Sequence, residues 1–148
     1  VVSQLPIGQC DSVELTNVKS ISYYGWGDGM DVFSSSNVIL DGVFCRNSDD
    51  CAAVYASTQG FKGGSNNVLV KNATLWADVA HPINIGGHGD PNGMDTVQNV
   101  TFRNIDILDQ AEKQIDYQGC LAINPGDNWC VILRSRIFGL KIFVTDSL

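Results

Sequence analysis

The sequence has few of the residues that build helical bundles. Among its 148 residues there are only two glutamates and two methionines, against 15 glycines. Strong helix formers are therefore scarce, while Val, Ile, Asn, Asp and Ser, which suit strands and turns, are abundant. No long window repeats its apolar residues with the period of a helix. The composition therefore predicts an all-β chain.

Other absences exclude whole classes of function. No stretch of 18 apolar residues occurs, so we predict no membrane-spanning helix. The 9 Lys and Arg residues are outnumbered by 16 Asp and Glu, and the net charge of −7 repels phosphate backbones and anionic lipids. We therefore expect neither nucleic acid nor a membrane as partner. The five cysteines form no CxxC pair and no cluster with histidine, so we expect no metal and no cofactor.

A short repeat organises the chain. The dipeptide Asn-Val recurs four times, and each time it precedes a strand-like apolar run. A second strand-like run follows each repeat, and Gly, Asn, Asp and Ser separate the runs. The repeats begin at Asn17, Asn37, Asn67 and Asn99, and the second runs are Met30–Phe33, Ala52–Tyr55, Pro82–Ile85 and Leu121–Ile123.

Recurring strands without helices indicate a parallel β-helix, a solenoid in which matching residues stack between coils. We expect the repeated asparagines to stack as an amide ladder at a turn. An antiparallel β-sandwich is the alternative, since it also has short strands and frequent turns. We predict a single domain over residues 1–148 with about six coils. Neither end resembles a polar cap, so we interpret the chain as part of a longer solenoid.

Aligning the second strands brings acidic and basic side chains together. When Val32, Val54 and Ile85 are matched, the residues four positions earlier are Asp28, Asp50 and His81. Residues at equal positions of neighbouring coils lie about 4.8 Å apart. These three side chains, with Asp49 beside them, are therefore predicted to form one cluster.

Paired carboxylates are what hydrolysis of a glycosidic bond requires. One carboxyl group donates a proton to the leaving oxygen, while the other is ionised and activates water. Asp49 and Asp50, with Asp28 one coil away, supply the carboxyl groups that such a site needs. The structural alternative is that Asp49-Asp50 only ends a strand and binds backbone amides. Asp31 is a further candidate, and the alternation allows it to face either the same groove or the opposite side.

At these residues the chain resembles a known family. The segments Gly27–Asp31, Ser35–Val38 and Ser48–Cys51 are similar to the motifs of polygalacturonases. Part of the chain is also similar to dextranases, isopullulanase and α-1,3-glucanases. All of these are right-handed parallel β-helix glycoside hydrolases that invert the anomeric carbon. The resemblance implies that fold, with Asp49 as general acid and with Asp28 and Asp50 holding the hydrolytic water.

The resemblance also implies a histidine, and two residues compete for that role. His88 lies in Gly-His-Gly, as in polygalacturonases, whereas His81 occupies the register that the aligned strands predict. We favour His81 as catalytic and place His88 among the substrate-binding candidates. The other candidates for binding substrate are Trp26, Asp31 and Lys113, Trp26 being the best placed of the aromatic residues to stack on a sugar ring.

One departure from the family bears on the substrate. Polygalacturonases bind the uronate with an Arg-Ile-Lys segment, whereas the corresponding strand here, Gly119–Asn124, has no basic residue. A carboxylate buried without its cation would be unfavourable. We therefore expect an endo-acting inverting hydrolase of a neutral α-glucan such as dextran. The alternatives are a polygalacturonase acting on pectin, and a non-catalytic carbohydrate-binding or structural β-helix.

The remaining expectations concern location and assembly. Asn72-Ala-Thr and Asn99-Val-Thr are acceptor sequences for N-glycosylation, which suits a secreted, extracellular protein. We expect a monomer whose partner is a polysaccharide.

Overall fold

The computed structural model describes residues 2–90, 92–93, 95–108, 119–124 and 134–143. Within these residues all regular secondary structure is β-strand, and every pairing between strands is parallel. The described part of the chain contains no helix long and apolar enough to cross a membrane. The all-β prediction is confirmed.

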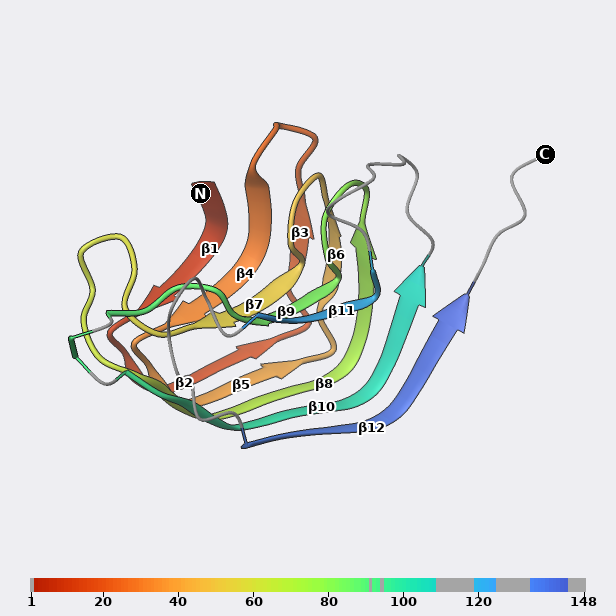
Figure 1. Cartoon of the computed structure of the whole chain (residues 1–148). Helices are drawn as coiled ribbons and strands as arrows, with labels where there is room; N and C mark the ends of the chain where they lie inside the picture. The colour runs from red at the N-terminus through yellow and green to blue at the C-terminus, as the bar shows by residue number, and fades with distance from the viewer. Residues whose placement is uncertain (1, 91, 94, 109–118, 125–133, 144–148) are drawn as a thin grey trace.

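The strands form two sheets that share one interior (Figure 1). The first sheet has the order β1-β4-β7-β9-β11 and the second the order β12-β10-β8-β5-β2, so the chain alternates between the sheets as it advances. Two short strands, β3 and β6, pair with each other, and β6 also pairs with the end of β8. This is the predicted right-handed parallel β-helix.

The strands of the first sheet are β1 (Val2–Gly8), β4 (Gly27–Phe33), β7 (Ala52–Tyr55), β9 (Ile83–Gly86) and β11 (Leu121–Asn124). The others are β2 (Asp11–Thr16), β3 (Lys19–Ile21), β5 (Ser36–Asp41), β6 (Phe44–Asn47), β8 (Ser65–Ala77), β10 (Val97–Leu108) and β12 (Arg134–Phe143).

Alternation of side chains builds the interior. Val38, Val68 and Val100 are matched residues of neighbouring strands, and all three are buried. Two residues further along, Leu40, Val70 and Phe102 form the next buried layer. Each such side chain contributes about 1.5–3 kcal/mol when it is removed from water. Every coil therefore rests on the apolar layers of the next.

Asparagines bend the strands of the second sheet. Asn37, Asn67 and Asn99 have φ of 54–58°, the left-handed region that asparagine tolerates better than most residues. The side-chain amide of Asn67 donates to Asn37 Oδ1 at 2.7 Å, while Asn99 donates to Asn66 Oδ1 at 2.8 Å. The expected amide ladder is therefore present between Asn37 and Asn67 only, because Asn99 bonds Asn66, which is not one of the repeated asparagines.

The first Asn-Val repeat belongs to a different line of residues. Because Thr16 pairs with Asp41, and Asp41 with Lys71, Asn17 matches Gly42 and Asn72 rather than Asn37. These three residues also have positive φ. Assigning Asn17 to the repeat of Asn37 was therefore wrong, since two parallel lines of left-handed residues cross this sheet. Asn72 and Asn99, in the two acceptor sequences, each lie in one of these lines.

Candidate active site

The register of the first sheet brings the predicted site together. Met30 on β4 pairs with Ala52 on β7, and Ala52 pairs with Ile83 on β9. Two residues earlier on each strand are Asp28, Asp50 and His81, so the alignment made from the sequence matches the pairing. Backbone hydrogen bonds continue it, from Gly29 N–H to the Asp50 carbonyl and from Cys51 N–H to the His81 carbonyl.

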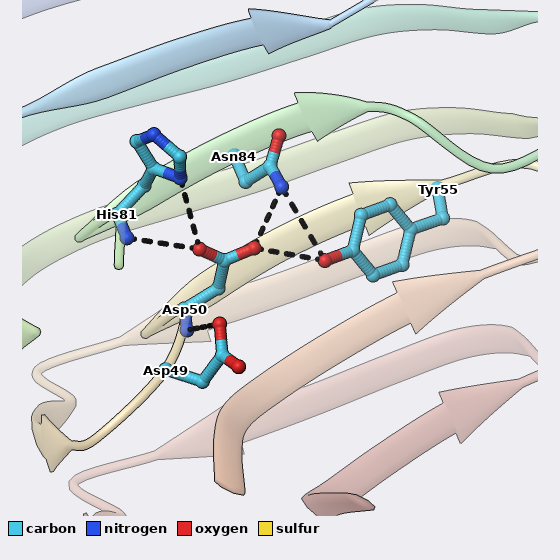
Figure 2. Close-up of polar contacts among 5 residues, drawn as sticks. All are labelled: Asp49, Asp50, Tyr55, His81 and Asn84. Atoms are coloured by element: carbon cyan, nitrogen blue, oxygen red, sulfur yellow. Dashed lines mark hydrogen bonds and ion pairs between the residues drawn. The ribbon is translucent and has the colours of Figure 1, made fainter. Parts of the chain in front are cut away.

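Asp50 is the best-connected carboxylate of the cluster (Figure 2). Its Oδ1 accepts a hydrogen bond from the backbone N–H of His81 at 2.9 Å and lies 3.3 Å from His81 Nδ1. Its Oδ2 accepts from the Asn84 amide at 2.6 Å and from the Tyr55 hydroxyl at 3.0 Å. The side chain is therefore held on both oxygens by residues of two coils.

Asp49 and Asp50 differ in their environment although they are adjacent. Burial favours the neutral form of Asp50, but the hydrogen bonds from His81 and Asn84 outweigh it and hold the pKa below its usual range. Burial raises the pKa of Asp49, and the neighbouring charge of Asp50 raises it further. Asp49 accepts one hydrogen bond, from the backbone N–H of Asp50 at 3.0 Å. One carboxyl group is thus kept ionised, and its half-buried neighbour holds a proton more readily.

Asp28 forms a second carboxyl pair with Asp31. Burial raises the pKa of Asp28 to about 9, and the charges of Asp31 and Asp49 add to this effect. Both side chains are buried, at 2% and 0% exposure. A proton held on Asp28 explains why two carboxyl groups coexist here. Asp31 is therefore buried beside Asp28.

The two histidines have different surroundings. His81 contacts Asp50 directly, whereas His88 is exposed and packs edge-on against the ring of Tyr55, with centroids 4.8 Å apart. Burial of part of its ring lowers the pKa of His88. The structure therefore places His81 in contact with the Asp50 carboxylate. His88 is separated from that carboxylate by the side chain of Tyr55.

Tyr55 and Asn84 are contacts that the sequence reasoning missed. Tyr55 is 3% exposed and packs beside Phe33 and Phe61. Both residues occupy outward positions of strands whose inward positions are apolar, at Val54 and Ile85. A polar residue at an outward position of β7 or β9, the strands that follow Asp50 and His81, was the available signal.

Trp26 lies at the edge of the cluster. Its side chain is 67% exposed, and the neighbouring Tyr24 is 70% exposed. The Asp49 N–H donates to the Gly27 carbonyl at 3.3 Å, and the Ser48 hydroxyl donates to the Tyr24 carbonyl. Backbone contacts therefore fasten this aromatic loop to the segment that contains Asp49.

A uronate substrate would need a cation close to the carboxyl cluster. β11 pairs with β9, so it lies one coil beyond His81 and Asn84, and it contains no Lys or Arg. Lys113 lies outside the described residues. Among the described residues, no group of three or more His, Cys, Asp or Glu side chains has the arrangement of a metal site.

The fold and the cluster together define a class of protein. A parallel β-helix with an ionised carboxylate beside a carboxyl group of raised pKa has the acid and base of glycoside hydrolysis. Comparison with protein families agrees: residues 4–113 match the model of glycosyl hydrolases family 28. The chain belongs to that family.

Three curated relatives illustrate the similarity. The chain is 34% identical over 86 residues to an exopolygalacturonase of Cochliobolus carbonum and to a probable exopolygalacturonase X of Aspergillus fumigatus. It is 36% identical over 85 residues to a probable endo-xylogalacturonan hydrolase A of Neosartorya fischeri. Each match covers 57% of this chain but only 17–18% of the relative. No solved structure matches the chain.

Proposed function

We propose that the chain contains the catalytic centre of an inverting glycoside hydrolase that cleaves a galacturonan of the pectin class. The observation that carries this proposal is the contrast between Asp49 and Asp50. Asp50 is held ionised by its donors, while Asp49 has a raised pKa and a single hydrogen bond. Such a pair supplies a base and an acid at the same pH.

In the proposed reaction Asp49 protonates the oxygen of the leaving sugar. Asp50 takes a proton from the water that attacks the anomeric carbon from the opposite face, which inverts its configuration. His81 holds the Asp50 carboxylate in place from the next coil. Asp28, protonated through its pair with Asp31, completes the cluster and binds the same water through its carboxyl group. No cofactor or metal takes part in these steps.

The galacturonan assignment rests on the relatives, whose names specify polygalacturonase and xylogalacturonan hydrolase activity. It replaces the expectation of dextran or another neutral α-glucan, since the names of these relatives specify neither. In this proposal Trp26 stacks on a sugar ring beside Asp49, since aromatic faces favour the apolar face of a pyranose. His88 and Lys113 remain candidates for contact with the substrate.

A neutral α-glucan remains the second candidate because of one observation. The strand one coil beyond His81, β11, has no basic residue to neutralise a uronate carboxylate. An acidic chain of net charge −7 also repels a polyanion in general. The two candidates share one mechanism and differ only in the substrate, so one set of assays separates them.

The deciding experiment measures release of reducing sugar from polygalacturonate, xylogalacturonan, dextran and α-1,3-glucan. We expect hydrolysis of a galacturonan and a loss of at least about 100-fold in Asp49→Asn, which cannot donate the proton. Asp106→Asn is the matched control, because Asp106 lies on β10 in the opposite sheet. Hydrolysis of dextran alone would support the second candidate.

Two further assays complete the test. Binding of polysaccharide without release of sugar would refute catalysis by this chain and favour a carbohydrate-binding module. The product size distribution tests the expectation of endo action, since internal cleavage gives oligomers early and terminal cleavage gives monomers. Secretion and the monomeric state are part of the same proposal. Gel filtration of the purified protein tests the monomeric state, and assay of the protein in the culture medium of its native cells tests secretion.

A further inference from the structure

Two buried cysteines lie directly behind the carboxyl cluster. Cys45 is on β6 and Cys51 follows Asp50 immediately, and both have 0% exposure. Their side chains belong to the apolar interior between the sheets. The other described thiols are differently placed: Cys10 is exposed and Cys120 is half-buried. Only residues 46–50 separate Cys45 from Cys51, and they include Asp49 and Asp50.

The two thiols are already in contact. Cys51 Sγ donates to the carbonyl oxygen of Cys45 at 3.6 Å, so the Cys51 thiol lies against the other cysteine. Cys45 Sγ also donates to Asn47 Oδ1 at 2.9 Å. The absence of a side chain at Gly29 leaves room for this arrangement, because a Cβ there would lie 2.7 Å from Cys45 Sγ.

We propose that Cys45 and Cys51 form an intrachain disulfide under oxidising conditions, and that the structure presents its reduced form. The bond closes a small ring that includes both adjacent aspartates. This proposal concerns the folded chain itself and does not depend on hydrolysis of any polysaccharide.

The bond forms by exchange with an organic disulfide such as oxidised glutathione or a thiol oxidoreductase. The thiolate of one cysteine attacks the donor, giving a mixed disulfide and one donor thiol. The second thiolate attacks the mixed disulfide, forming the sulfur–sulfur bond and releasing the second donor thiol. Two cysteine thiols are oxidised, one donor disulfide is reduced to two thiols, and the two protons end on the released thiols.

Exchange must take place while the chain folds. Burial raises the pKa of the Cys45 thiol, and the neighbouring Cys51, Asp31 and Asp28 raise it further. A thiol that resists ionisation and is closed off from solvent is a poor nucleophile. Forming the bond removes a thiol donor from Asn47, but a thiol is a weak donor and its loss is small.

The sequence offers a direct test by peptide mapping. Trypsin cleaves after Arg46, which separates Cys45 in residues 20–46 from Cys51 in residues 47–62. Each of these peptides contains a single cysteine, while Cys10 is in residues 1–19. Protein made in an oxidising compartment is denatured in an alkylating reagent without reductant and then digested. We expect the two peptides to be recovered linked, with the mass of their sum less two hydrogens.

Two variants sharpen the result. Cys10→Ser should leave the linked peptides unchanged, whereas Cys45→Ser should give the 47–62 peptide alkylated at Cys51. Reductant should lower the melting temperature of the wild-type protein by several degrees and leave that of Cys45→Ser unchanged, since small rings add a few degrees of stability. Recovery of both wild-type peptides in alkylated form, or of Cys51 linked to another cysteine, would overturn the proposal.

Discussion

One carboxylate oxygen of Asp50 contacts two nitrogen atoms of His81. Oδ1 accepts the backbone N–H of His81 at 2.9 Å and lies 3.3 Å from its Nδ1. The first contact ties the carboxylate to the backbone of the next coil, and the second ties it to that residue's ring. A shift of one residue between β7 and β9 would break both contacts. The stacking of coils that makes the fold therefore also sets the geometry of the candidate site.

This relationship predicts different roles for the two adjacent aspartates. Asp50→Asn should reduce the free energy of unfolding by about 1–3 kcal/mol, because an amide NH2 would face donors that need an acceptor. Asp49→Asn should change it by less than about 0.5 kcal/mol, since Asp49 accepts one hydrogen bond that an amide oxygen also accepts. Urea denaturation of both variants tests this prediction, and equal losses of stability would contradict it.

The opposite pKa shifts predict a bell-shaped pH profile. The rate should rise with pH as Asp50 ionises, at a pH below the usual range of a carboxyl group, and fall as Asp49 loses its proton above that range. Asn84→Ala removes a donor to the Asp50 carboxylate, so the pKa of Asp50 should rise and the acidic limb should move to higher pH. Initial rates across the pH range measure both limbs. An unchanged acidic limb in Asn84→Ala would show that Asp50 is not the base.

The buried Asp28 carboxyl group predicts how stability depends on pH. The pKa of Asp28 is about 9 in the folded chain and near 3.8 when unfolded, so the folded state binds more protons between these values. The free energy of unfolding should therefore fall as pH rises from about 4 to 9. Asp28→Asn keeps a donor for Asp31 without this dependence, and it should melt several degrees higher than wild type at pH 8.

At pH 4 the same comparison serves as the control. Asp28 is protonated in the folded state there, and pH 4 lies close to the pKa of 3.8 of the unfolded state, so the cost has hardly begun to build up and the two proteins should differ little. Thermal melts of both proteins at the two pH values give the result. If the difference in melting temperature were the same at pH 4 and pH 8, protonation of Asp28 would not be the cause of the pH dependence of stability.

The sequence was sufficient for the parts of the site that follow from the repeat. Matching Val32, Val54 and Ile85 placed Asp28, Asp50 and His81 in one line, because side chains in a solenoid stack at equal positions. The donors Tyr55 and Asn84 were missed because the direction of a polar side chain depends on how the surrounding coils pack.

The misassigned Asn17 has a related cause. Both lines of left-handed residues use asparagine, so a dipeptide alone does not distinguish one line from the other. Only the pairing of Thr16 with Asp41 shows which line Asn17 joins. The abundance of asparagine therefore predicts that such left-handed positions exist. To predict which of them align between coils, the length of each segment that connects the strands must also be known.

The close approach of β4 to the Asp50 segment predicts that Gly29 tolerates no side chain. A Cβ at this position would lie 2.4 Å from the Cys51 carbonyl oxygen, and moving that backbone would disturb the hydrogen bond from Gly29 to Asp50. Gly29→Ala should therefore lower the free energy of unfolding by about 1–3 kcal/mol. Gly25→Ala is the matched control, because a Cβ there meets nothing within 4 Å. Urea denaturation measures both variants, and a Gly29→Ala protein as stable as Gly25→Ala would show that the two segments separate at little cost.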